Sequence, residues 1–298
     1  MAAERAGKGF RGSIRRAAVL PERYSLGAAR IRARLKEMTE CLGRWDMVPT
    51  IPATASALDR HPEIVREIAG VDHAIHGYRH VAYASRPGRE QAGDLDRAIE
   101  SFTRHGLKCH GFRAPYLSAD ETTLALLQER RFLFDSSGRQ FLLPQSHPLA
   151  DEAMRLATVR YHEVVRGPIL PEARGSLVEI PVALPDDEIL VDGLEISNPS
   201  TLTDVFMAMF REARSSGSLL VLQVHPERFH LCLEAVRSVL TEATEVGAWK
   251  ATLSEVATWT LKHESRTWPD GHPMAVAVSG DLDAVSLGDF TRRLWGVV

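Results

Sequence analysis

The sequence predicts a single α/β domain of barrel-like form, in which parallel strands alternate with helices. Along most of its 298 residues, segments with apolar residues at helical spacing alternate with short apolar runs of the strand type. This alternation favours parallel strands joined by helical crossovers. No internal repeat or low-complexity tract divides the sequence. Its 44% hydrophobic and 25% charged residues are the usage of an ordinary globular protein with a sizeable core.

The elements before residue 138 follow a regular order. Residues 1–21 are basic and contain glycine, and we expect a loosely ordered segment there, followed by one domain over 22–298. A helix over 26–45 and a strand in 47–54 form the first unit. The units that follow, each a helix and then a strand, are 62–70 with 72–77, 92–106 with 108–115, and 119–131 with 132–137.

Residues 138–176 interrupt this order because four prolines lie within them, and we expect a long irregular excursion there. Regular patterns then return. The later predicted elements are strand 177–182, helix 202–217, strand 218–226, helices 229–247 and 252–264, and strand 274–280. The last of these reads MAVAVSG, an apolar run typical of a strand that is buried on both faces.

Charge and cysteine content exclude several classes of function. A formal net charge of −3 gives no electrostatic footprint for nucleic acid or an anionic membrane, and we expect neither as a partner. The three cysteines lack C-x-x-C spacing, so neither a disulfide framework nor a thiolate zinc site is predicted, and the cytoplasm is the expected location. The first 20 residues lack the apolar core of a secretion signal, and no apolar stretch reaches membrane-spanning length.

Reactive side chains follow four of the predicted strands. They are His76 with His80, the run from Arg113 to Tyr116, His225, and Asp281 with Asp283. Because the carboxyl ends of parallel strands share one edge, we expect these groups to converge. The run HGYRH alone is a weak indication of a metal site. With a carboxylate from another strand end it becomes a set of two imidazoles and one carboxylate, which suits Zn²⁺ or a related divalent ion.

Taken together, these stretches resemble the polysaccharide deacetylase family, the NodB-homology (carbohydrate esterase family 4-like) hydrolases. HGYRH is similar to the family's paired-histidine motif, GFRAPY to its R-x-P-Y motif, and LQVHP to the strand that carries its catalytic histidine. FLFDSS, LVEIPVALPDDE and WKATLSEVATW resemble stretches of its imidase and allantoinase-like branch. The resemblance covers residues 22–262 and implies a distorted, incomplete (β/α) barrel.

The family's first motif, a strand that ends in two aspartates, is missing from the N-terminal region. Instead, AVAVSGDLDA near the C-terminus resembles its D-x-D variant. We therefore predict a circular permutation in which the family's first strand stands last. The segment VSLGDFTRRLWG is then expected to be part of the cut loop that led to the first helix. The strand could complete the site of its own chain or of a neighbour in a homo-oligomer.

The resemblance implies a role for each residue of the metal site. Asp283, His76 and His80 would bind one divalent ion, with Zn²⁺ favoured, and Asp281 would be the general base that takes a proton from water. Arg113 would keep Asp281 ionised and oriented. The alternatives from the residues alone are a solvated turn aspartate and a surface ion pair of little energetic weight.

Three further residues receive roles by the same resemblance. His225 would be the general acid, the alternative being a strand-end histidine without a catalytic part, and the Tyr116 backbone N–H would stabilise an oxyanion. Asp135 would either steady a catalytic histidine or cap the loop that follows it. Asp186 and Asp187 are candidates for substrate contact, although acidic loop residues are usually only solvated.

The expected activity is metal-dependent hydrolysis of an amide C–N bond, by N-deacetylation or N-deacylation of a small molecule or sugar conjugate. Hydrolysis of a cyclic imide or ureide is the close alternative. A non-haem iron oxygenase also uses two histidines and a carboxylate, but that class is typical of all-β barrels. A non-catalytic binding protein on the same fold is the remaining alternative, and it would normally have lost part of the residue set.

Overall fold

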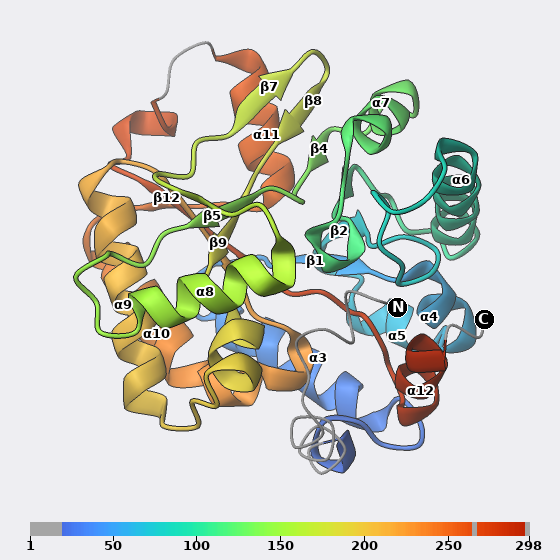
Figure 1. Ribbon diagram of the computed structural model, residues 1–298, viewed down its shortest axis with the longest axis horizontal. Coiled ribbons are helices and arrows are strands. Elements are labelled where there is room, and N and C mark those ends of the chain that lie inside the picture. Colours follow the sequence, from blue (N-terminus) through green and yellow to red (C-terminus); the bar gives the residue numbers. More distant parts are fainter. Residues whose placement is uncertain (1–19, 264–266, 296–298) are drawn as a thin grey trace.

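The computed structural model describes residues 20–263 and 267–295, and Figure 1 shows the arrangement of their helices and strands. Most of the predicted N-terminal segment 1–21 lies outside these ranges, whereas residues 20–23 are helical. A membrane-crossing helix, which must be both long and apolar, is not found among the described residues.

The fold is a mixed α/β structure built on a curled sheet, as the sequence predicts. The main sheet has nine strands in the order β10-β12-β1-β2-β3-β4-β8-β7, with β11 also paired to β12. All its pairs are parallel except β7 with β8. Its strands are β1 (Thr50–Ala53), β2 (Asp72–Ile75), β3 (Gly111–Phe112), β4 (Phe134–Asp135), β7 (Glu172–Arg174), β8 (Leu177–Glu179), β10 (Leu219–Gln223), β11 (Trp249–Lys250) and β12 (Ala275–Ser279).

A second sheet of three parallel strands in the order β6-β5-β9 lies beside the first. It consists of β5 (Arg139–Phe141), β6 (Val165–Arg166) and β9 (Val182–Leu184). The α-helices, which surround the strands in Figure 1, are α3 (Ala29–Gly43), α4 (Ala55–Arg60), α5 (Ile64–Glu67), α6 (Gly88–Arg104), α7 (Glu121–Glu129), α8 (Ala150–Tyr161), α9 (Pro199–Ser215), α10 (Phe229–Glu245), α11 (Leu253–Lys262) and α12 (Leu287–Trp295).

The C-terminal strand β12 is part of the core sheet. It pairs in register with β10 from Leu219↔Ala275 to Gln223↔Ser279, and on its other side Ser279 pairs with Thr50 of β1. All five of its residues are buried, which explains the uninterrupted apolar run in the sequence. Directly after β12, a Cβ on Gly280 would lie 2.1 Å from the Val224 carbonyl oxygen. Only glycine fits this close approach.

The two ends of the described chain meet. The backbone N–H of Leu287 at the start of α12 donates to the Ser25 carbonyl oxygen at 2.9 Å. The rings of Tyr24 and Phe290 pack with their centroids 5.4 Å apart. Residues from the beginning and the end of the sequence therefore share one surface of the fold.

The prediction of an irregular excursion over 138–176 is wrong. This stretch contains α8, a helix of 12 residues, together with β5, β6 and β7. The prolines lie before and after α8 and do not interrupt it. Its buried face consists of Ala150, Ala153, Ala157 and Tyr161, and this spacing of mostly small residues gives a weak apolar pattern.

The C-terminal segment, predicted as a loop, also forms a helix, α12. Asp289 accepts hydrogen bonds from the backbone N–H groups of Val285 (3.2 Å) and Ser286 (3.1 Å), while Ser286 Oγ accepts from the Asp289 N–H at 3.2 Å. This reciprocal pair is a capping box, and the sequence S-L-G-D was the signal for it. The ion pair of Asp289 with Arg60 at 2.5 Å ties α12 to α4.

Candidate active site

The predicted site residues come together at the carboxyl ends of neighbouring strands. His76 directly follows β2, Arg113 directly follows β3, His225 lies two residues after β10, and Asp281 and Asp283 follow β12. Because β12 lies between β10 and β1, its two aspartates reach the same edge as the groups from the other strands. The order of the strands in the sheet thus brings two aspartates from near the C-terminus into one site with residues from the first half of the sequence.

His76, His80 and Asp283 form a cluster with the geometry of a metal site. Asp283 Oδ1 lies 3.2 Å from His76 Nε2 and 3.3 Å from His80 Nε2. His76 Nδ1 donates to the Arg113 carbonyl oxygen at 2.8 Å, which leaves the Nε2 lone pair directed at Asp283. His76 Nε2 and Asp283 Oδ1 are buried acceptors without a hydrogen-bond partner among the described residues. Acceptors that face one another in this way fit a shared cation.

Electrostatics also suits His80 to metal binding. Burial lowers the pKa of His80 to about 4, and the guanidinium of Arg293 acts in the same direction. The ring is therefore neutral at pH 7, which is the form that binds metals. Arg293, which no sequence motif indicated, extends from α12 and donates to Asp283 Oδ2 at 2.5 Å. This ion pair occupies the oxygen of Asp283 that does not face the histidines.

Asp281 is held by two buried donors. Arg113 Nη1 donates to its Oδ1 at 2.7 Å, and Gln223 Nε2 donates to its Oδ2 at 2.9 Å. Arg113 is fully buried, and its Nε and Nη2 groups donate to the carbonyl and hydroxyl oxygens of Ser136 at 3.0 and 2.9 Å. The ion pair of Arg113 with Asp281 is therefore buried, and the alternative of a surface ion pair is wrong. Asp281 Oδ2 lies 3.8 Å from His76 Nε2, beside the metal-site cluster.

His225 pairs with Asp187 rather than with Asp135. Asp187 Oδ1 lies 2.7 Å from His225 Nδ1, and Asp187 Oδ2 accepts the His225 backbone N–H at 2.8 Å. Burial alone would lower the pKa of His225, but the Asp187 carboxylate outweighs it and holds this pKa well above its usual value. Asp187 is fully buried, so it is not a solvated loop residue. Its position two residues after Pro185 carried no signal of this pairing.

Asp135 caps the loop that follows it, which was one of its two expected roles, and makes no described contact with a catalytic histidine. Its carboxylate accepts the Ser137 backbone N–H at 3.1 Å and the Ser137 hydroxyl at 2.6 Å, and its described contacts include neither His76, His80 nor His225. Ser137 Oγ in turn accepts the Ala114 backbone N–H at 2.8 Å. Asp135 therefore steadies the segment that carries Arg113. Burial raises the pKa of Asp135 to about 7.

Tyr116 lies in the short helical turn η1 (Pro115–Leu117) with φ of 59°, a left-handed conformation that is unusual for a tyrosine. Its ring meets the His80 ring edge-on, with the centroids 4.5 Å apart, and the Arg293 guanidinium lies 5.6 Å above it. Backbone strain of this kind gathers at functional sites. The turn places Tyr116 on the wall of the cavity beside the metal-site cluster.

A small cavity opens onto these groups. Its lining also includes six residues that the sequence analysis did not name as site residues, namely Leu117, Arg160, Tyr161, Glu188, Gln223 and Arg293. Arg160 at the end of α8 pairs with Glu188 of η2 (Glu188–Gly193) across the cavity wall. The side chains of His76, His80, His225, Asp281 and Asp283 are each at most 9% exposed. The reactive groups are therefore nearly closed off from bulk solvent.

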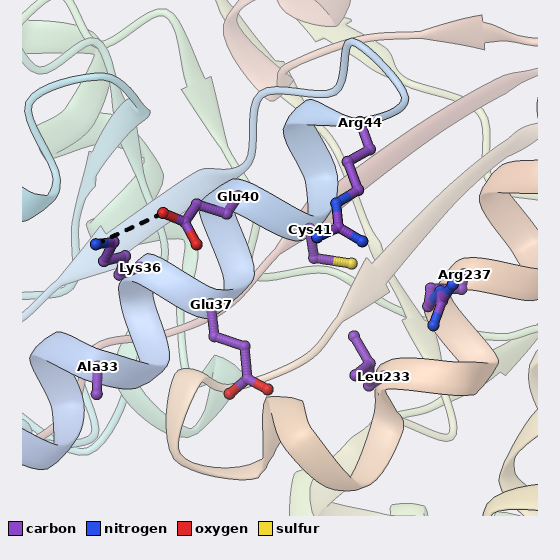
Figure 2. A pocket seen from close by; sticks show the side chains of 8 residues that line it. All are labelled: Ala33, Lys36, Glu37, Glu40, Cys41, Arg44, Leu233 and Arg237. Atoms are coloured by element: carbon purple, nitrogen blue, oxygen red, sulfur yellow. Dashed lines mark ion pairs between the residues drawn. The ribbon is translucent and has the colours of Figure 1, made fainter.

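A second hollow lies on the outside of the fold, between α3 and α10. Figure 2 shows its lining, which includes Lys36, Glu40 and Arg44 of α3 and its C-cap, and Arg237 of α10. It contains none of the predicted site residues. Its lining comes from α3, the C-cap of α3 and α10, and the charged side chains among these residues mark it as a solvated groove between helices.

Comparison with known proteins gives a match to one family and a likeness of fold. Residues 29–132 match the family model described as polysaccharide deacetylase. A peptidoglycan deacetylase-like protein, FGM2 of Gibberella zeae, is 38% identical over 72 residues, which are 23% of this chain and 21% of that protein. The match thus spans about a fifth of the length of that relative.

Two solved structures show the same fold. A provisionally named polysaccharide deacetylase from Mycobacterium smegmatis aligns with a TM-score of 0.60 and 24% identity over 78% of each chain. Puue allantoinase aligns with a TM-score of 0.58 and 18% identity over 76% of this chain and 72% of its own. At these identities the likeness concerns the fold alone.

Proposed function

We propose that this chain is a member of the polysaccharide deacetylase family, whose model matches residues 29–132, and that it is a metal-dependent hydrolase that removes an acyl group from an amide nitrogen. The observation that carries the proposal is the buried set of facing acceptors, His76 Nε2 and Asp283 Oδ1, beside a second carboxylate, Asp281, that is held by Arg113. A divalent ion, with Zn²⁺ favoured, would be held by His76, His80 and Asp283 and would supply Lewis-acid chemistry, acidifying water and polarising the scissile carbonyl.

The remaining groups supply proton transfer. Asp281 takes a proton from the attacking water as general base, and its hydrogen bonds to Arg113 and Gln223 hold its carboxylate in place. His225 donates a proton to the leaving nitrogen as general acid. Its bond through Nδ1 to Asp187 leaves Nε2 for that proton. We assign the Tyr116 backbone N–H to the carbonyl oxygen, where charge develops during attack.

The closure of the site supports a small substrate. With the five reactive side chains at most 9% exposed and the Arg160–Glu188 pair across the cavity wall, a polymer chain has poor access to the reactive edge. We therefore propose a small molecule or sugar conjugate. Hydrolysis of a cyclic imide or ureide is the second candidate, because FLFDSS, LVEIPVALPDDE and WKATLSEVATW resemble stretches of the imidase and allantoinase-like branch. The free thiols of Cys41, Cys109 and Cys232 support a cytoplasmic setting.

We also propose that the chain is a circular permutant of its family. The position of β12 between β10 and β1 supports this relation. The contacts of Tyr24 and Ser25 with α12 support it as well, because a permutation requires neighbouring ends.

The proposed activity is tested by assaying metal-loaded protein against N-acetylated sugars, other small amides, cyclic imides and ureides. We expect turnover of at least one class, lost on treatment with a chelator and restored by a divalent ion. Asp281→Asn should retain the metal and slow turnover by roughly two to four orders of magnitude, the usual contribution of general base catalysis. Tight binding of the panel without turnover would favour a binding protein, and turnover by metal-free protein would contradict the mechanism.

A further inference from the structure

The loop that joins the two histidines of the metal-site cluster is not helical. Residues 76–80 follow β2 as irregular backbone, so the four-residue spacing of His76 and His80 does not by itself place both rings on one face. In a helix the backbone geometry would set the distance between the two rings. Here the tertiary contacts of the loop must fix the conformation that brings both Nε2 atoms to within 3.3 Å of Asp283 Oδ1.

One buried carboxylate on α6 binds the N–H side of this loop. Asp94 Oδ2 accepts the Tyr78 backbone N–H at 2.8 Å, and Asp94 Oδ1 accepts the Arg79 backbone N–H at 3.4 Å. The Tyr83 hydroxyl donates to Oδ2 at 2.6 Å. Asp94 is only 5% exposed, so these hydrogen bonds face little competition from water. A single side chain thus binds both residues at the middle of the turn between His76 and His80.

The carbonyl side of the loop is held by α4. The backbone N–H groups of Ala55 and Ser56, in the first turn of α4, donate to the carbonyl oxygens of Gly77 (3.0 Å) and Tyr78 (2.9 Å). These N–H groups have no partner within the helix and are available to the loop. The loop backbone is therefore fixed between the start of α4 on one side and Asp94 of α6 on the other.

Gly77 shows how closely the carboxylate approaches. Its φ is +73°, and a Cβ at this position would lie 2.8 Å from the Arg79 carbonyl oxygen and 3.2 Å from Asp94 Oδ2. Glycine both permits the left-handed backbone and leaves room for Asp94. The glycine of HGYRH and the carboxylate on α6 are thus parts of one arrangement.

We propose that Asp94 is a positioning residue of the metal centre, which fixes the 76–80 loop so that His76 and His80 can bind one ion together. The inference rests on the proposed function, because it presupposes that these histidines bind a divalent metal. Asp94 itself does not contact the reacting atoms. Groups that orient metal ligands by hydrogen bonds, without contacting the metal themselves, typically contribute about 10- to 100-fold to metal affinity.

The test is the metal affinity of the folded protein, measured by competition with a chelating indicator, using Zn²⁺ as the probe and no substrate. Asp94→Asn replaces one acceptor oxygen with an NH₂ group that faces backbone N–H donors, and we expect its affinity to fall by about 10- to 100-fold. At saturating metal its turnover should return towards that of the wild type. Tyr83→Phe removes only the hydroxyl contact, and we expect a measurable loss of affinity that stays below about tenfold.

Asp96→Asn is the matched control. It makes the same change on the same helix, but the Asp96 side chain is 62% exposed and pairs with Arg130 at the surface, so its metal affinity should equal that of the wild type. Circular dichroism and thermal unfolding without metal establish that each variant is folded. If Asp94→Asn does not fold, Tyr83→Phe decides the question, and wild-type affinity in that variant overturns the inference.

The same data separate the inference from the proposed function. Wild-type protein that binds no Zn²⁺ contradicts the proposed metal-dependent hydrolase. Wild-type protein that binds Zn²⁺, together with a folded Asp94→Asn variant of equal affinity, contradicts the positioning role of Asp94 alone.

Discussion

Replacing Asp187 by asparagine should move the basic limb of the pH–rate profile to lower pH. The change keeps the shape of the side chain but removes the charge that lies 2.7 Å from His225 Nδ1. Burial on its own lowers the pKa of His225, and the carboxylate is what raises it. In the wild type His225 therefore stays protonated as the pH rises past neutrality, and the general acid is lost only when the pH passes the raised pKa. In the variant that loss should begin at lower pH.

The contact distance sets the size of the effect. An opposite charge this close typically changes a pKa by about 1 to 3 units, and above the pKa each unit is a tenfold change in the protonated fraction. We therefore expect kcat/KM of Asp187→Asn to fall by about 10- to 1,000-fold on the basic side of the profile. The loss should be much smaller on the acidic side, where both proteins carry a protonated His225. Metal content should not change, because Asp187 is not one of the proposed ligands His76, His80 and Asp283.

The assay is kcat/KM from pH 5 to 10 for the wild type, Asp187→Asn, His225→Ala and the double variant, on any substrate that the wild type turns over. Because Asp187 acts through His225, the double variant should be no slower than His225→Ala. A basic limb that stays in place in Asp187→Asn would refute the reasoning. So would a double variant whose loss equals the product of the two single losses.

Two further predictions concern the metal and the last strand. His76→Ala and His80→Ala should each lose the bound divalent ion together with hydrolysis, and full occupancy in either variant by elemental analysis would remove that histidine from the site. A chain truncated after residue 265 should be insoluble or free of metal, because it lacks Asp283 and leaves β10 and β1 without the strand between them. Soluble, fully active truncated protein would show that β12 and its aspartates are dispensable.

The sequence by itself determined the α/β class, most of the strands and the convergence of the reactive groups. Periodicity is a local property, and parallel strands place their carboxyl ends at one edge, so the sequence alone predicts that the residues after β2, β3, β10 and β12 lie close together. The uninterrupted apolar run of β12 indicated burial on both faces. The proximity of Asp283 to His76 and His80 followed from that placement.

Only the tertiary structure decided which polar groups are paired and which stretch covers the site. The carboxylate that binds His225 is Asp187, 38 residues away, and nothing in local sequence distinguishes it from Asp135. The contact of Arg293 with Asp283 depends on how α12 packs. Because prolines lie on both sides of α8 and its apolar pattern is weak, the sequence predicted irregular structure there. The helix that carries Arg160 to the cavity was therefore missed. Local patterns encode secondary structure, whereas pairing depends on distances and burial that arise only when distant segments pack together.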